Sequence, residues 1–167
     1  MKNILFIFVA LLCLVLISNF ITKENIIPEN AIRIRVIANS NSEEDQKLKK
    51  EIKNDLEFFL YDKLKDIDNI EVADKTIKKE LPSVKKLIEK YTDNYKVNYG
   101  LNYFPKKEYK GIEYNEGEYK SLVVTLGNGL GDNWWCVLFP PLCLLEATES
   151  TDVEYHSYVV DLINKYK

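Results

Sequence analysis

Histidine and cysteine are scarce in this sequence, with one histidine and three cysteines among 167 residues. So few soft ligands do not make a structural zinc site within one chain, and neither a metal nor another cofactor is expected. Glycine and proline number only 6 and 5, which excludes collagen-like, elastic and linker-dominated chains. The 23 basic residues do not outnumber the 26 acidic ones and form no concentrated block, so nucleic acid is not expected as a partner.

The chain does contain enough apolar side chain for one packed domain, with 46% hydrophobic and 12% aromatic residues. Its first residues differ from the rest, because Lys2 precedes an unbroken apolar stretch from 4 to 17, the pattern of an export signal. No pair of small residues marks a cleavage site, and about 18 apolar residues reach the lower limit of a spanning helix. A cleaved signal peptide and a signal anchor are therefore both open. We expect this export segment at 1–21, a spacer at 22–30 and an exported domain at 31–167.

Hydrophobic periodicity predicts an α+β fold for the exported domain. Apolar and charged residues alternate over 32–37, as in a half-buried strand, and Ser42 with the acidic residues after it marks a helix start. A second helical pattern contains Pro82, which predicts a kink or two short helices meeting near Leu81. We expect a single domain with a small mixed or antiparallel sheet packed by two to four helices, and a loop region rich in Gly, Pro and aromatic residues at 127–145. The predicted strands lie around 32–37, 97–103 and 119–126, and the predicted helices around 42–64, 77–91 and 153–166.

Glycines at 127, 129 and 131 follow a predicted strand and invite comparison with a phosphate-binding loop. The spacing is not that of G-x-G-x-x-G, and no Lys-Ser or Lys-Thr pair follows. Trp-Trp and Pro-Pro come next in place of a helix. Nucleotide binding is therefore not expected.

Residues 134–145 carry no charged side chain, and their Pro-Pro pair is incompatible with a regular helix or a central strand. We interpret this segment as an apolar loop. Either it folds back over the core, or it leaves Trp134, Trp135 or Phe139 partly exposed for another protein or a membrane surface.

Two cysteines, Cys136 and Cys143, lie within this apolar segment. An exported domain meets an oxidising environment, which favours a disulfide between them. Such a bridge would hold the loop in one shape and reduce the ordering cost of binding. The alternatives are two buried reduced thiols, or a thiol enzyme in which His156 and Asp132 activate one of the cysteines.

Five segments of the sequence stand out together: 32–40, 45–46, 103–105, 117–119 and 129–143. Taken together, they resemble one known protein family, that of stage II sporulation protein R. The resemblance covers roughly residues 30–145, and its most specific part includes Trp-Trp-Cys and Pro-Pro. Asp132 stands where many relatives have histidine, which weakens the thiol-enzyme alternative, and Asn-Glu at 115–116 replaces an expected Pro-Ala.

The resemblance implies a signalling protein made in the forespore of an endospore-forming bacterium. Such a protein is exported into the space between the forespore and mother-cell membranes, either secreted or held by its N-terminal segment. The implied partner is the membrane-embedded aspartic protease of the mother cell, which converts the sigma-E precursor into the active factor. The implied role is that of a ligand and not of an enzyme, so no catalytic residue is assigned.

We expect the segment 134–143, locked by the disulfide, to contact that protease, because a few buried aromatic side chains can dominate such an interface. An exported thiol-dependent hydrolase that uses Cys136 or Cys143 with His156 is the alternative function, and a wall- or membrane-surface binding module is a third. The expected partner-binding residues are Asp132, Asn133, Trp134, Trp135 and Phe139, with Arg33 and Arg35 framing the site from the first strand.

Overall fold

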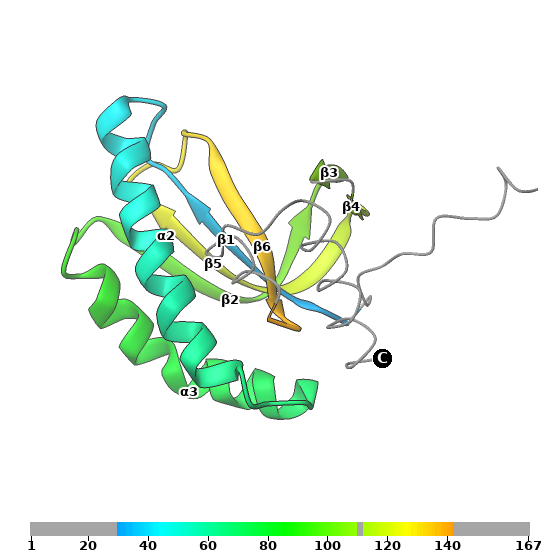
Figure 1. Ribbon diagram of the computed structural model, residues 1–167. Coiled ribbons are helices and arrows are strands. Elements are labelled where there is room, and N and C mark those ends of the chain that lie inside the picture. Colours follow the sequence, from blue (N-terminus) through cyan, green and yellow to red (C-terminus); the bar gives the residue numbers. More distant parts are fainter. Residues whose placement is uncertain (1–29, 110–111, 142–167) are drawn as a thin grey trace, which may run out of the picture.

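The structure is a computed structural model that describes residues 30–109 and 112–141. A strand, two helices and five further strands follow one another along these residues (Figure 1). The expected export segment at 1–21, Cys143, His156 and the expected helix at 153–166 lie outside the described residues. The elements are β1 (Ile32–Ile37), α2 (Glu43–Leu64), α3 (Ile70–Ile88), β2 (Tyr95–Phe104), β3 (Lys107–Tyr109), β4 (Ile112–Tyr114), β5 (Gly117–Leu126) and β6 (Asn133–Phe139).

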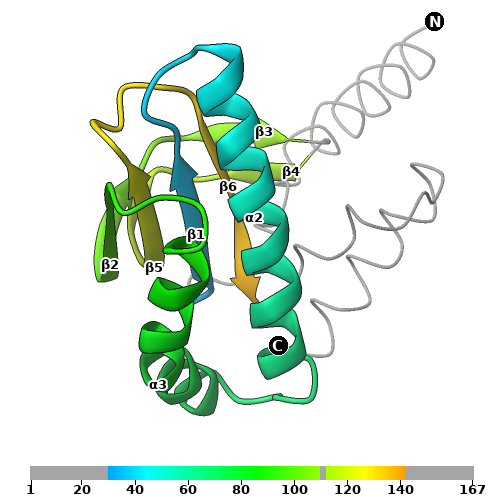
Figure 2. The ribbon, with the colours of Figure 1, turned by 90° about the vertical axis from the view of Figure 1, so that its left-hand side faces the viewer.

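The main sheet has four strands in the order β2-β5-β1-β6, and β3 and β4 form a separate two-stranded ribbon. β1 runs parallel to β5 and antiparallel to β6, while β2 and β5 are antiparallel. Both helices pack on one face of this sheet (Figure 2). A mixed sheet covered by two helices in a single domain confirms the predicted α+β class.

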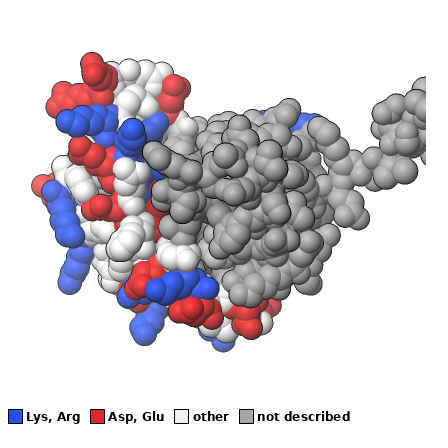
Figure 3. All heavy atoms as spheres, viewed as in Figure 1, with Lys and Arg blue, Asp and Glu red and all other residues white. Residues whose placement is uncertain are grey.

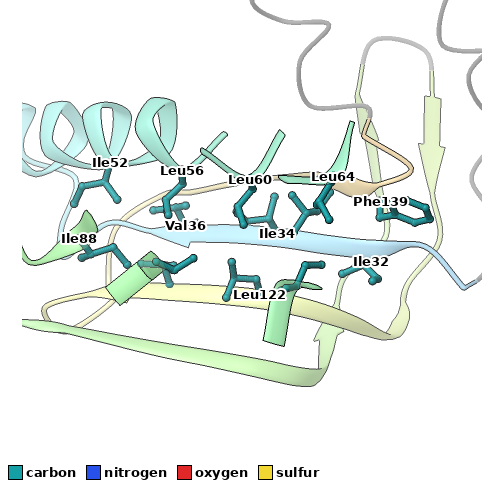
Figure 4. Packing of buried hydrophobic residues seen from close by; sticks show 14 of the residues in the cluster. Ile32, Ile34, Val36, Ile52, Leu56, Leu60, Leu64, Ile88, Leu122 and Phe139 are labelled. Atoms are coloured by element: carbon teal, nitrogen blue, oxygen red, sulfur yellow. The ribbon is translucent and has the colours of Figure 1, made fainter. Parts of the chain in front are cut away.

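The core lies between the two helices and this sheet face (Figure 4). Ile32, Ile34 and Val36 of β1 are fully buried there, as their alternation with charged residues predicts. The buried residues of α2 recur every fourth position and so form one stripe along the helix that faces β1. These residues of α2 are Ile52, Leu56, Leu60 and Leu64.

Both helix starts are fixed by side chains that cap free backbone N–H groups. The Ser42 hydroxyl accepts a hydrogen bond from the Asp45 N–H at 3.2 Å, which confirms the predicted start of α2. Asn69 caps α3 by accepting from two backbone N–H groups, and α3 begins earlier than the periodicity indicated. Pro82 lies inside α3, which is one continuous helix. Of the two predicted outcomes at this proline, two short helices are therefore wrong, and a kink stays a prediction.

The expected loop region at 127–145 is only partly a loop. Residues 133–139 form the strand β6, which pairs with β1, and the interpretation of 134–139 as an irregular apolar loop is wrong. The Pro-Pro pair does not prevent this strand, because it follows the last strand residue and β6 lies at an edge of the sheet. The turn between β5 and β6 remains as the glycine-rich part of the expected loop.

Surface charge on the described part of the chain is mixed. In Figure 3, basic and acidic side chains are interspersed over the coloured part of the face, without a block of one sign. Within residues 30–109 and 112–141, neither helix is both long enough and apolar enough to cross a membrane.

Candidate functional site

The sheet face opposite the helices is built around two arginines of β1. Arg33 and Arg35 alternate with the core residues of that strand and therefore lie on the other side of the sheet. Neither α2 nor α3 packs against this side, which we call the helix-free face. Arg33 and Arg35 were both expected to frame the site, and the structure places both of them on the helix-free face.

Arg33 is almost completely buried, with 2% of its surface exposed, although it carries a charge. Its guanidinium carbon lies 3.3 Å from the ring centroid of Tyr119, 5.2 Å from that of Phe104 and 5.5 Å from that of Trp135. The rings also contact one another edge to face, with centroids 5.4 Å apart for Phe104 and Trp135. Attraction between the cation and the three ring faces offsets part of the cost of burying the charge.

Arg35 lies beside this cluster and has a different environment. Its Nη2 donates to the Tyr103 carbonyl at 2.8 Å, and its guanidinium carbon lies 4.0 Å from the centroid of the Phe104 ring. The buried Nε of Arg35 has no hydrogen-bond partner, and no carboxylate of the described residues forms an ion pair with it. Burial lowers the pKa of the Arg35 guanidinium. The site thus holds a partly desolvated cation whose charge no described carboxylate neutralises.

The expected aromatic anchors divide between the two sides of the sheet. Trp135 belongs to the helix-free face, whereas Trp134 packs against the core on the other side, with Lys53 Nζ 4.9 Å from its ring centroid. Phe139 is a core residue with 3% of its surface exposed. Adjacent residues of a strand point to opposite faces, so the two tryptophans cannot act together at one contact surface.

Cys136 lies on the helix-covered side, where it packs against the core. It is half-buried and forms no disulfide with another described residue. Its expected disulfide partner, Cys143, is not among the described residues. The disulfide therefore stays a prediction, as does the pairing of either cysteine with His156.

Asp132 joins the turn before β6 to the loop after β1. Its backbone N–H donates to the side-chain oxygen of Asn41 at 2.6 Å, and its carbonyl accepts from Lys49 Nζ at 3.0 Å. Asn133, the other residue expected to provide directional hydrogen bonds, is exposed and pairs with Ile37 in the sheet. The structure therefore gives Asp132 an internal partner and leaves the side chain of Asn133 at the surface.

The glycines of the turn between β5 and β6 are explained by its close contact with the loop after β1. A methyl group at Gly131 would overlap the carbonyl of Ser40, and one at Gly127 would overlap the side chain of Asn39. Gly127 also has a φ of +54°, a conformation that favours glycine. The glycines admit the chain's own backbone at close range, which accounts for them without a phosphate ligand.

Phe104 and Tyr119 belong to the arginine cluster but were not predicted as site residues. Phe104 ends β2 and Tyr119 lies near the start of β5, on either side of the β3–β4 ribbon. Both occur in short motifs that carry the family resemblance, at 103–105 and 117–119. Those motifs could have indicated both residues. The alternation in β2 could not have indicated Phe104, because it assigns the core-facing side to the odd-numbered residues.

Comparisons with known proteins agree on one family. The family model "Stage II sporulation protein R (spore_II_R)" matches residues 28–149. The protein named "Stage II sporulation protein R" from Bacillus subtilis (strain 168) is 39% identical over 135 residues, which make up 77% of this chain and 60% of that protein. The chain thus spans less than two thirds of the length of this curated relative. No solved structure matches the chain significantly.

Proposed function

The chain belongs to the stage II sporulation protein R family, and from this premise we propose that it is an exported signal of sporulation that acts by protein–protein contact. Its partner in this proposal is the membrane-embedded aspartic protease of the mother cell, which it activates to process the sigma-E precursor. The export pattern at 1–21 supports a site of action between the forespore and mother-cell membranes. The chain acts as a ligand in this scheme and performs no chemical step.

The contact surface that we propose is the helix-free face, with Arg35 at its centre. The observation that carries this choice is the guanidinium of Arg35, which is partly desolvated and has an unpartnered Nε and no carboxylate partner among the described residues. A carboxylate of the partner beside the guanidinium would neutralise its charge. Trp135, which is only partly buried, would supply aromatic contact area beside it, and the fully buried Phe104 supports both side chains from within.

This surface replaces the apolar loop as the proposed centre of contact. Phe139 is buried in the core and Trp134 packs under α2, so both support β6 from within. Asn133 is exposed at the start of β6 and extends the proposed surface toward its end.

The decisive experiment replaces the native protein with this chain in sporulating cells that lack their own stage II sporulation protein R. Arg35→Gln removes the charge and the planar pair of donors, and we expect conversion of the sigma-E precursor to fall about tenfold, because a charge-assisted hydrogen bond contributes about 1.5–3 kcal/mol. Immunoblots of the precursor measure the conversion. Arg35→Lys keeps the positive charge but lacks the planar guanidinium, and should give an intermediate rate of precursor conversion.

Lys47→Gln is the matched control, since it removes one positive charge from an exposed position on α2. We expect this variant to process the precursor at the parental rate. Parental processing by Arg35→Gln would contradict the proposed contact. An equal loss in Lys47→Gln would show that net charge, and not this site, is what matters.

The thiol-hydrolase alternative is tested in the same cells. Cys136→Ser and His156→Ala should leave processing intact if the protein is a ligand, apart from any change in stability. A severe loss in both variants, with normal amounts of folded protein, would favour the enzyme.

A further inference from the structure

The outer edge of the sheet at β2 has features of a pairing surface. β2 is ten residues long and pairs only with β5 among the described strands, so its other edge is open. Eight consecutive residues, 97–104, carry no charge, and Lys96 is the one charged residue of the strand. Long edges without charge are avoided in monomeric proteins, because they pair with other strands.

The described fold gives no reason for a glycine at position 100, in the middle of this strand. A methyl group added there would have no atom within 4 Å, and the residue does not adopt a positive φ. Glycine in the interior of a strand weakens it and often marks the close approach of another backbone. Gly100 therefore weakens the strand at a position where the described fold does not require glycine.

The two halves of β2 differ on the side of the sheet that carries the helices. Val97 and Tyr99 pack against the core, and the Tyr99 hydroxyl donates to Asp74 of α3 at 2.8 Å. Leu101 and Tyr103 continue the same row but are 68% and 57% exposed. Gly100 marks the boundary between the covered half and the exposed half.

We propose that β2 pairs with β2 of a second copy of this chain, antiparallel and centred on Gly100. Because the two strands run in opposite directions and cross at residue 100, the exposed half of each strand lies beside the covered half of the other. Leu101 then lies opposite Tyr99, and Tyr103 lies opposite Val97, an aromatic and β-branched pair of a favourable kind. A second copy of the chain suits this pairing, because each β2 strand contains both a covered half and an exposed half.

Charge also favours a second copy as the occupant. In this register Lys96 lies opposite Phe104, so the two lysines do not face each other. Asn98 lies opposite Asn102 of the other copy, so uncharged amides face each other there; within one chain Asn98 Nδ2 donates to Asn102 Oδ1 at 2.9 Å. The result is one continuous sheet across both copies, with both pairs of helices on the same side. This inference does not depend on the proposed function.

The register is tested by disulfide cross-linking of the full chain, in a mild detergent that keeps the apolar N-terminal stretch dispersed. In Gly100→Cys the two new thiols face each other at about 4.5–5.5 Å between Cα atoms, which suits a disulfide. In Asn98→Cys they are four residues out of register, about 13 Å apart, and cannot bond. Peptide mapping by mass spectrometry distinguishes the new bridge from any bond of the native cysteines.

We expect a residue 100 to residue 100 bridge in Gly100→Cys and none in Asn98→Cys, while the double variant Asn98→Cys with Asn102→Cys should link again. A bridge in Asn98→Cys alone, or none in the double variant, which keeps Gly100, would overturn the proposed register.

Sedimentation velocity tests the association itself. The parental chain should sediment as a dimer, and Leu101→Lys as a monomer, because the added charge would be buried against the partner's Tyr99. Phe58→Lys is the matched control, since Phe58 is a 77% exposed apolar residue of α2, and this variant should remain dimeric. A monomeric parent, or equal behaviour of the two lysine variants, would overturn the proposal.

Discussion

Side chains that alternate along β1 meet different surroundings on the two faces of the sheet. Ile34 and its apolar neighbours are fully buried under α2 and α3, where only apolar packing is needed. Arg33, one position away, is buried to nearly the same degree among three aromatic rings. The two faces therefore differ less in how far their side chains are buried than in the chemistry of the buried group.

The comparison also shows that the two faces contribute to the free energy of folding in different ways. Apolar side chains gain stability from leaving water and need no partner of a particular kind. A buried guanidinium is stable only with suitable neighbours. The helix-covered face should thus be the more sensitive to loss of volume, and the helix-free face to loss of charge.

The largest effect is expected on the helix-covered face. Leu60→Ala removes a fully buried side chain from the stripe of α2 that faces β1, and should lower the free energy of unfolding by about 2–5 kcal/mol. Urea denaturation measures this change. Phe58→Ala, on the exposed side of the same helix, should change stability by about 0.5 kcal/mol or less. Equal losses in the two variants would contradict the assignment of the core.

A smaller effect is expected for Arg33 on the helix-free face. Arg33→Ala removes both the stem that packs on the rings and the charge above them, and should cost about 2 kcal/mol. Arg33→Met keeps a stem of similar volume and should cost about 1 kcal/mol, which isolates the charge. Urea denaturation of both variants gives the two values. A methionine variant more stable than the parent would show that desolvation of the charge outweighs its contacts with the rings.

The smallest effect is expected at the rim of the helix-covered face, where Asp74 joins α3 to β2 and β5. Burial opposes its ionisation, but hydrogen bonds from Lys78, Tyr99 and Lys120 outweigh this and lower the pKa of Asp74 from 3.8 to about 2. Because the folded state holds the carboxylate ionised, its contribution of about 1–2 kcal/mol is complete above pH 4 and is lost as the pH falls toward 2. Asp74→Asn should therefore be less stable than the parent at pH 6.

The difference between the parental chain and Asp74→Asn should disappear near pH 2, as measured by urea midpoints across that range. Asp62→Asn serves as a control, because Asp62 forms ion pairs with lysines at an exposed position, where water screens the charges. A difference between parent and Asp74→Asn that does not change between pH 6 and pH 2 would contradict this assignment.

Local signals in the sequence were sufficient for β1 and α2. The alternation over 32–37 and the cap at Ser42 are each complete within a few residues, so no distant information was needed. The same holds for β2 and β5, whose alternating patterns predicted both strands. The described core therefore follows largely from patterns of period 2 and period 3.6.

The strand β6 was missed because its position in the sheet is not a local property. The Pro-Pro pair argued against a strand, yet an edge strand that ends before the prolines loses no pairing. This error also led to Trp134 and Trp135 being grouped as anchors, although neighbouring strand residues point apart. The cluster around Arg33 was only half predicted for a related reason, since Phe104 and Tyr119 arrive from strands distant in the sequence.

The sheet order places β1 between β5 and β6, so the first strand of the described chain is flanked by its last two. A chain that leaves a ribosome or a translocation channel with its N-terminus first exposes β1 without a sheet neighbour until residues 117–126 have emerged. The apolar faces of both helices likewise lack half of the surface that they cover, because β5 contributes to the same core. Stable folding consequently requires nearly the whole described chain, because β1 has no sheet neighbour without β5 and β6.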